Sequence, residues 1–355
     1  MGQRVKKNGR AKRAGWALES FLKTVSTLAF QGVPTSALGS SLSQSLSSSL
    51  TSLLPLPLLP ALSLILALTL PTPAPAAPIS VVDDSGATVT LDAPAHRIIS
   101  LAPHTTELIY AAGGAGAIVG AVNYSDYPPA AQQLPRVGDN QALDLEKIAA
   151  LKPDLLVVWR HGNAQRQLGA LRALGIPMFY SEPKQLPDIA ANLHKLGELM
   201  GTETVADQAA QEFTTKIAHL RAQYAGRSTV TVFYQVWETP LMTLNGSHMV
   251  SDVIRLCGGS NVFASLESVA PTVSTEAVIA ANPDAIITGR YGNTDPDTLP
   301  KSLDRWKSWT ALTAVAHHNL FAVNADWLDR PAPRIADGAA QLCTTLDTAR
   351  QHLGR

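Results

Sequence analysis

The stretch LDLEKIAALKPDLLVV, Leu143 to Val158, recurs in outline as VSTEAVIAANPDAIIT, Val273 to Thr288, without a gap and at an offset of 130 residues. In each copy a capping residue opens a short helix, a proline follows the helix, and an apolar run predicts a buried strand. A chance likeness of two helix–turn–strand units is the alternative. The match favours two similar lobes, because it includes four positions: Asp144 with Ser274, Glu146 with Glu276, Pro153 with Pro283, and Asp154 with Asp284.

Short apolar strands alternate with helices on both sides of each copy. In the first half, a hairpin at residues 79–91 precedes predicted strands at 97–102, 155–159 and 176–180. In the second half, strands are predicted at 229–236, 284–288 and 319–323, and a final helix runs through Cys343. Strands that alternate with helices predict a parallel sheet with helices on its faces.

The alternation breaks between the two halves, where two helices follow one another. The second runs from Thr202 towards Gly226 without an internal Gly or Pro, which predicts a length of about 35 Å. A crossover helix within one sheet is the alternative. We therefore predict an α/β fold with two Rossmann-like lobes, residues 78–184 and 227–355, joined through residues 185–226 by a single long backbone helix.

The first 77 residues resemble an export signal. A basic head and a Ser-rich stretch precede an apolar segment, Leu53 to Leu70, and the small-residue end PTPAPAAP, which are the parts of a secretory signal. A transmembrane anchor is the alternative. Pro55, Pro57 and Pro60 leave an uninterrupted apolar run of ten residues, well short of the about 20 that a spanning helix needs. We predict export and cleavage of residues 1–77.

The charge of the remaining chain argues against one class of partner. Residues 1–77 hold seven of the 28 basic residues and one of the 28 acidic residues, so residues 78–355 hold 21 and 27, a net charge of −6. A mildly acidic body without basic runs is not typical of a nucleic-acid-binding protein.

The chain has two cysteines, Cys257 and Cys343. An isolated pair in an exported protein favours a disulfide, with two buried free thiols as the alternative. Two cysteines alone cannot form a structural zinc site.

No enzyme motif is present in the sequence. G-x-S-x-G, a Walker loop and H-E-x-x-H are all absent, and the nine histidines are scattered, so neither a catalytic centre nor a resident metal is predicted. An exported α/β enzyme is the alternative of a different class, and it would need a nucleophile and a base.

Aromatic and polar residues follow the predicted strands. Tyr124, Trp159 and Trp237 each lie at a strand end, and Asp326 to Arg330 form a dense cluster after the strand at 319–323. Ligands of open α/β sheets bind outside the carboxyl ends of the strands, and aromatic walls suit a large planar ligand. Core packing is the alternative for each single aromatic residue.

Glu146 and Glu276 occupy the first turns of the two repeated helices. There the helix dipole favours an acid by about 0.3–1 kcal/mol, which is a sufficient explanation for one such residue. Two acids at equivalent points of two lobes would also suit docking onto a two-fold symmetric partner that has a basic residue on each half.

From Ile79 to its C-terminus the chain resembles the helical-backbone class (class III) of periplasmic substrate-binding proteins, which serve importers of cobalamin, haem and iron-siderophores. Within this family the likeness is greatest to the cobalamin-binding members. The segments that carry the resemblance are SVVDDSGATVTLDAPAHRIISLAP (80–103), RIISLAPHTTEL (97–108), NYSDYPP (123–129), LEKIAALKPDLLVVWRHGN (145–163), LCGGSNVF (256–263) and DWLDRPAPR (326–334).

The resemblance implies a ligand cleft between the lobes. Residues at matching positions that it assigns to the cleft are Pro103, Tyr124, Trp159, Asp326, Trp327, Leu328, Asp329 and Arg330. It assigns Glu146 and Glu276 to docking on arginine pockets of a permease, and it pairs Cys257 with Cys343 in a second-lobe disulfide.

The resemblance also implies a function without catalysis. A monomeric periplasmic receptor would bind cobalamin (vitamin B12) or a related corrinoid as its transported ligand, not as a cofactor. It would deliver this ligand to an ABC importer made of a permease homodimer and its ATPase.

The chain departs from the cobalamin-binding pattern at four positions. Asn140 and Ala270 replace cleft tryptophans, Met242 replaces a phenylalanine, and His104 replaces a small residue. Trp237 would restore aromatic surface, so we predict that His104, Trp237 and Met242 also line the cleft. Haem or a ferric siderophore is the alternative ligand, and His104 is either a metal ligand or a solvated loop residue.

Overall fold

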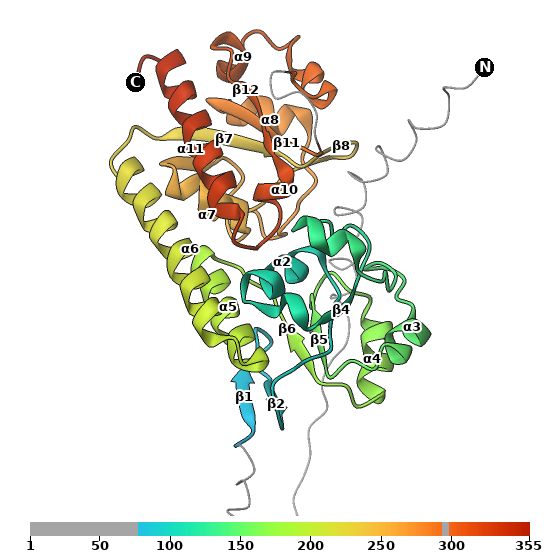
Figure 1. Ribbon diagram of the computed structural model, residues 1–355. Helices are drawn as coiled ribbons and strands as arrows, with labels where there is room; N and C mark the ends of the chain where they lie inside the picture. The colour runs from blue at the N-terminus through green and yellow to red at the C-terminus, as the bar shows by residue number, and fades with distance from the viewer. Residues whose placement is uncertain (1–76, 293–297) are drawn as a thin grey trace, which may run out of the picture.

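The computed structural model describes residues 77–292 and 298–355. All but Ala77 of the predicted export signal lies outside the described residues, as does the end of the polar loop after Arg290. Figure 1 shows two lobes, one above the other, with a pair of helices along one side.

The first lobe is built on a parallel sheet with the strand order β4-β3-β5-β6. A predicted hairpin, β1 (Ile79–Val82) and β2 (Thr88–Leu91), precedes this sheet and pairs antiparallel. The sheet strands are β3 (Ile98–Ser100), β4 (Ile118–Ala121), β5 (Leu155–Val158) and β6 (Met178–Tyr180), and the helices are α2 (Pro103–Ala111), α3 (Leu145–Ala150) and α4 (Gln165–Ala173), with short 3-10 turns at Gly114–Gly116 and Pro129–Gln133. All four residues of β5 are buried, as the apolar run predicts.

The second lobe repeats this plan with the strand order β10-β7-β11-β12. Its sheet strands are β7 (Val230–Gln235), β10 (Gly259–Asn261), β11 (Ala285–Arg290) and β12 (Leu320–Asn324), beside a small hairpin of β8 (Trp237–Glu238) and β9 (Leu241–Met242). Its helices are α7 (Met249–Leu256), α8 (Thr275–Ala281), α9 (Thr313–Ala316), α10 (Ala325–Leu328) and α11 (Ile335–His352), with a 3-10 turn at Lys301–Trp306. β5 and β11, the strands of the two repeated units, occupy equivalent places in the two sheets.

The repeated unit has the same local structure in both lobes. Asp144 caps α3 by accepting the Lys147 N–H at 2.9 Å, and Ser274 caps α8 by accepting the Ala277 N–H at 3.1 Å. The residue before each proline, Lys152 or Asn282, has a positive φ of 47° or 41°. The likeness is therefore structural, and the chance alternative is wrong.

The aspartate of each copy ties the unit to the neighbouring strand. Asp154 accepts the N–H of Arg97 at 3.0 Å just before β3, and Asp284 accepts the N–H of Thr231 at 2.9 Å in β7. Each carboxylate thus fixes the register of a central strand at its amino end.

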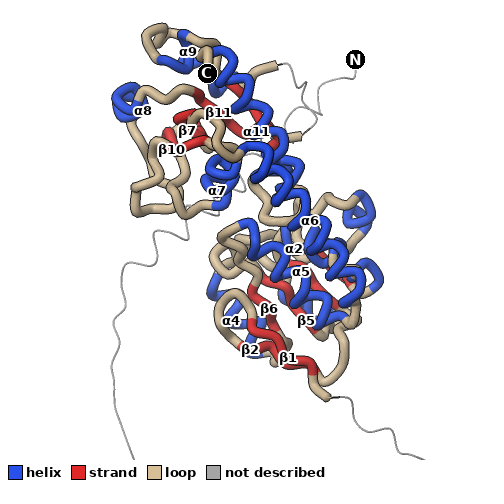
Figure 2. The backbone as a smooth tube through the Cα atoms, turned by 90° about the vertical axis from the view of Figure 1, so that its left-hand side faces the viewer, coloured by secondary structure: helices blue, strands red, loops and turns tan. Residues whose placement is uncertain are grey.

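Two packed helices, α5 (Leu186–Met200) and α6 (Glu203–Tyr224), connect the sheets. Gly201 joins them in the left-handed conformation, with a φ of 64°. The 22 residues of α6 extend over about 33 Å, and Figure 2 shows this helix passing from one lobe to the other. Since β6 and β7 belong to different sheets, the crossover alternative is wrong.

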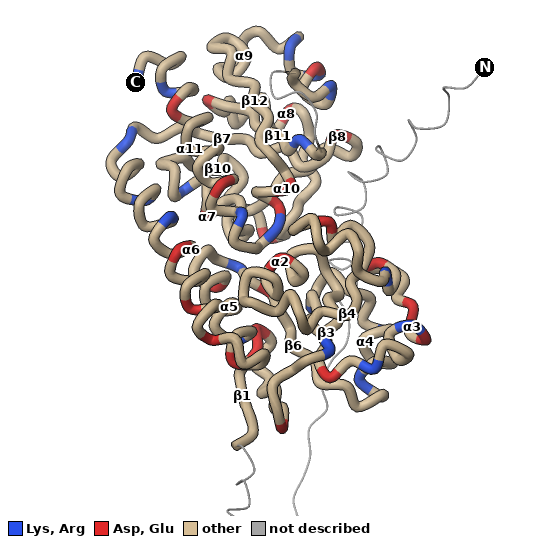
Figure 3. The backbone as a smooth tube through the Cα atoms, viewed as in Figure 1, with Lys and Arg blue, Asp and Glu red and all other residues tan. Residues whose placement is uncertain are grey.

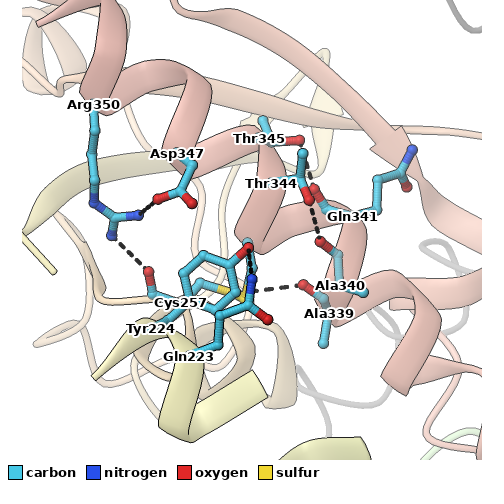
Figure 4. Close-up of a disulfide and its surroundings, with 11 residues drawn as sticks. Gln223, Tyr224, Cys257, Ala339, Ala340, Gln341, Thr344, Thr345, Asp347 and Arg350 are labelled. Atoms are coloured by element: carbon cyan, nitrogen blue, oxygen red, sulfur yellow. Dashed lines mark hydrogen bonds and ion pairs between the residues drawn. A yellow bond between two sulfur atoms is a disulfide. The ribbon is translucent and has the colours of Figure 1, made fainter. Parts of the chain in front are cut away.

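Cys257 and Cys343 form a disulfide with a Cα–Cα distance of 4.7 Å. The bond joins the end of α7 to α11, and Figure 4 shows Gln223 and Tyr224 of α6 beside it. Both cysteines are fully buried, so the bond cross-links the second lobe close to the end of the backbone helix.

Candidate functional site

The carboxyl edges of the two sheets face each other across the lobe boundary. β3 leads into Pro103 and α2, and β12 leads into α10 and Arg330. Arg330 and Glu107 of α2 are 3.1 Å apart, which places these two edges in contact. In Figure 3, acidic and basic positions meet where α10 faces α2. The boundary is the place where open α/β sheets bind ligands.

Tyr124 lies in the loop after β4, on the first-lobe side of this boundary. Its backbone is left-handed, with a φ of 66°, which is uncommon for a bulky residue and holds the loop in a defined turn. Together with Asn123, Asp126, Gln132 and Arg136, it lines a pocket of about 410 Å³. This pocket is polar, and Asp126 also contacts Arg330 of the second lobe.

His104 and Trp159 pack together at the ends of β3 and β5, with ring centroids 5.5 Å apart and an edge-on geometry. His104 is 4% exposed and lies in the first turn of α2, so the prediction of a solvated loop residue is wrong. Burial lowers the pKa of His104 to about 4, which keeps its ring neutral. The ring hydrogen-bonds the backbone of Ser181, and its Nε2 has no protein partner.

Asn140 is a second buried residue with side-chain atoms that lack a hydrogen-bond partner. It is 2% exposed, and neither atom of its side-chain amide has a protein partner. The Oγ of Ser181 is also buried and has no protein partner. The first lobe therefore offers uncharged hydrogen-bonding atoms near its carboxyl edge.

The hairpin of β8 and β9 places Trp237 opposite Met242. The indole N–H of Trp237 donates to the Thr239 carbonyl at 2.9 Å, and its ring is half-buried. Met242 is 1% exposed and belongs to the main apolar core. Its place in the cleft stays a prediction, since His104, which is also predicted to line the cleft, is buried as well. Ala270, where the cobalamin-binding pattern has a cleft tryptophan, is also buried, with 5% exposed.

The cluster after β12 divides into core and boundary residues. Leu328 is 1% exposed and packs in the core, and its ligand contact stays a prediction. Trp327, Asp326 and Arg330 are half-buried. The hydroxyl groups of Tyr234 and Tyr291 donate to Asp329 at 3.1 Å and 2.8 Å, while burial raises the pKa of this carboxyl to about 6. Asp329 is thus bound within its own lobe.

Glu107 and Arg334, which the sequence alone did not single out, also lie at the boundary. Arg334 donates to both oxygens of Glu107, with its Nε 2.8 Å from Oε2, and its guanidinium lies 3.8 Å from the centroid of the Tyr127 ring. Both residues fall within segments that carried the family resemblance. Nothing in the local sequence signals their pairing, because 227 residues separate them.

Glu146 and Glu276 lie in the first turns of α3 and α8, and both are exposed. Neither forms an ion pair with a cation in residues 77–292 or 298–355. In Figure 1, α3 is at the edge of its lobe away from α6, and in Figure 2, α8 has the same relation to α6. Hydrogen bonds from its own backbone N–H and from the Ser274 side chain lower the pKa of Glu276.

The described residues contain no group of three or more His, Cys, Asp or Glu side chains that could hold a metal ion. None of their helices is long and apolar enough to cross a membrane.

Comparisons with known proteins agree with this architecture. A family model described as periplasmic binding protein matches residues 98–326. The vitamin B12-binding protein of Vibrio cholerae is 42% identical over 259 residues, covering 73% of this chain and 91% of that protein. The vitamin B12-binding protein of Yersinia pestis is 39% identical over 292 residues, covering 82% and 93%.

Solved structures of periplasmic binding proteins also match this chain. The crystal structure of the periplasmic vitamin B12-binding protein of Vibrio cholerae matches with a TM-score of 0.66 at 42% identity, over 72% of this chain and 98% of that one. A periplasmic haem-binding protein from Roseiflexus matches with a TM-score of 0.62 at 23% identity, over 72% and 99%. At that identity the second likeness concerns the fold alone.

Proposed function

This chain belongs to the periplasmic binding protein family, and on that premise we propose that it captures cobalamin, or a related corrinoid, between its lobes and delivers it to an ABC importer. The observation that carries the proposal is the 42% identity to a vitamin B12-binding protein over a span that includes both lobes. The contact between the two sheet edges, through Arg330 and Glu107, supports a site at their boundary.

The proposed ligand contacts come from both lobes. The first lobe contributes Pro103, His104, Tyr124 and Trp159, and the second lobe contributes Trp237, Met242, Asp326, Trp327, Leu328, Asp329 and Arg330. Within the second set, Asp329 accepts hydrogen bonds from Tyr234 and Tyr291. Aromatic rings beside a few polar groups suit the face of a corrin ring.

The wider setting is also part of the proposal. The chain would be exported through residues 1–77 and would act in the periplasm as a monomer without catalysis. We take 78–184 and 227–355 as its lobes and 185–226 as the connector. Glu146 and Glu276 would dock one on each half of a permease homodimer, whose ATPase drives uptake, and no nucleic acid would be bound.

Haem is the second candidate ligand, because the Nε2 of His104 has no protein partner. Its ring is neutral, and the Ser181 hydrogen bond leaves the Nε2 lone pair free for a metal. A haem receptor would use this nitrogen as an axial ligand and would lose its shifted Soret band in a His104→Ala variant.

The direct test mixes the mature protein separately with cyanocobalamin and haemin, removes free ligand by gel filtration, and records the retained spectrum. We expect one corrinoid per chain. A Trp159→Ala variant should bind at least about tenfold more weakly, since losing a buried aromatic contact costs 1.4 kcal/mol or more.

Trp309→Ala is the matched control, because Trp309 is an exposed tryptophan (44%) after the 3-10 turn of the second lobe. Its affinity should equal that of the wild type. Retention of haemin without cobalamin would contradict the proposal in favour of the haem candidate. Turnover of a substrate without stoichiometric binding would favour an enzyme.

A further inference from the structure

Three charged side chains join the lobes at the candidate site. Glu107 of α2 is almost fully buried, with 2% of its side chain exposed, and Arg330 and Arg334 of the second lobe are 16% exposed. Arg334 binds both oxygens of Glu107, and the Nη1 of Arg330 binds one of them at 3.1 Å. One buried carboxylate of the first lobe thus holds two guanidinium groups of the second.

Two further carboxylates complete the shell of Arg330. Asp126 of the first lobe lies 3.1 Å from its Nη1, and Asp326 lies 3.2 Å from its Nη2. The group as a whole contains three carboxylates and two guanidinium groups, so its formal charge is negative. Two of the three carboxylates are more exposed than the arginines. Asp126 and Asp326 are 40% and 32% exposed, and each arginine is 16% exposed.

A ligand carboxylate and a ligand amide would meet this arrangement differently. A ligand carboxylate would have to draw Arg330 or Arg334 away from Glu107 and leave a buried carboxylate without its full set of partners, which is strongly unfavourable. It would also approach the exposed acids Asp126 and Asp326. A neutral amide needs no arginine, and its N–H groups can donate to these same acids.

We propose that Glu107 is a specificity-determining residue that, by holding Arg330 and Arg334, makes the site select tetrapyrroles with uncharged amide side chains over those with free carboxylates. This inference rests on the proposed function. It makes Glu107 a positioning residue, which acts through the two arginines and not through contact with the ligand.

The test compares two corrinoids that share the ring and both axial cyanides. Dicyanocobinamide carries amide side chains, and dicyanocobyrinic acid carries carboxylates at the same positions. Affinities of the mature protein for both are measured by titration calorimetry. We expect the wild type to prefer the amide by at least about 100-fold, and Glu107→Gln to reduce this preference by about tenfold by releasing the arginines.

Asp337→Asn is the control for net charge. It removes one carboxylate from α11, three residues after Arg334, but Asp337 is half-exposed and pairs with Lys216 at 3.8 Å. The preference of this variant should equal that of the wild type. Since Glu107 is buried, Asp126→Asn serves as a second variant at a more exposed position. It should shift the preference in the same direction as Glu107→Gln, by a smaller factor.

A parallel loss of both affinities in Glu107→Gln and Asp126→Asn, at an unchanged ratio, would overturn the inference and leave Glu107 a purely structural role. A wild type that binds the amide but shows no preference would overturn it as well, with the proposed function intact. A wild type that binds neither corrinoid would overturn the proposed function, and the inference with it.

Discussion

The two lobes are alike in scaffold and unlike at the edges where they meet. The capping residue, the left-handed residue, the proline and the tying aspartate occur in both copies of the repeated unit. The facing edges differ in chemistry: the first lobe contributes the carboxylates Glu107 and Asp126 and buried uncharged atoms without protein partners on His104 and Asn140, and the second contributes the guanidinium groups of Arg330 and Arg334. Residues that are repeated in both lobes therefore stabilise the fold. Residues at the facing edges differ between the lobes, and these are the candidates for ligand recognition.

Glu146 and Glu276 depart from this rule. They are repeated, as scaffold residues are, yet they are exposed and form no ion pair among the described residues. A shared external partner would account for their repetition.

The disulfide belongs to the second lobe alone among the described residues. Replacing both cysteines, Cys257→Ser with Cys343→Ser, should lower the free energy of unfolding by about 4 kcal/mol, because the bond closes a loop with a sequence separation of 86. Denaturant unfolding measures this loss. Hydrogen exchange should locate it at β7 and not at β3, and equal loss of protection in both sheets would contradict a lobe-specific role.

The tying aspartates should matter equally in the two lobes. Asp154→Ala and Asp284→Ala should each cost about 1–3 kcal/mol, since each leaves a strand-end N–H without its charged acceptor. Asp207→Ala is the control, because Asp207 is exposed and pairs only with the exposed His194. A large cost for one tying aspartate and none for the other would break the equivalence of the two copies.

The repeated glutamates should have the smallest effect on stability and the largest on transport. The double variant Glu146→Ala with Glu276→Ala should lower the free energy of unfolding by less than either tying-aspartate substitution, because each removes only a favourable charge at an exposed helix N-terminus. It should leave corrinoid affinity unchanged and abolish stimulation of the permease-bound ATPase in proteoliposomes.

Glu203→Ala with Glu212→Ala is the matched control for this experiment, since both residues are exposed on α6 and Glu203 also lies in a first helical turn. That variant should stimulate the ATPase as the wild type does. Weakened corrinoid binding in the Glu146 and Glu276 variant would move these acids into the site and overturn the docking proposal.

Most of the architecture could be predicted from the sequence, because the features that set it are local or repeated. The run at 155–158 is apolar at every position, and Asp144 and Gly113 lie where a helix begins or ends. The uninterrupted helix after Thr202 and the two copies of one unit together predict two lobes and a connector.

The site was less predictable, because burial and charge pairing depend on tertiary structure. Met242 lies opposite Trp237 and Leu328 within the cluster after β12, and both are buried in the main apolar core. Glu107 and Arg334 were missed because they meet only when the two lobes have assembled. The burial of His104 could not be predicted from its place in the sequence, because it depends on the packing of α2 beside Trp159.

The most direct test of this account is a crystal structure of the mature protein with cyanocobalamin. We predict one corrinoid between the lobes, in contact with Tyr124 and Trp159 on one side and Trp327 on the other, with Arg334 still bound to Glu107. A corrinoid held by one lobe alone, or a boundary still closed with the ligand elsewhere, would contradict the account.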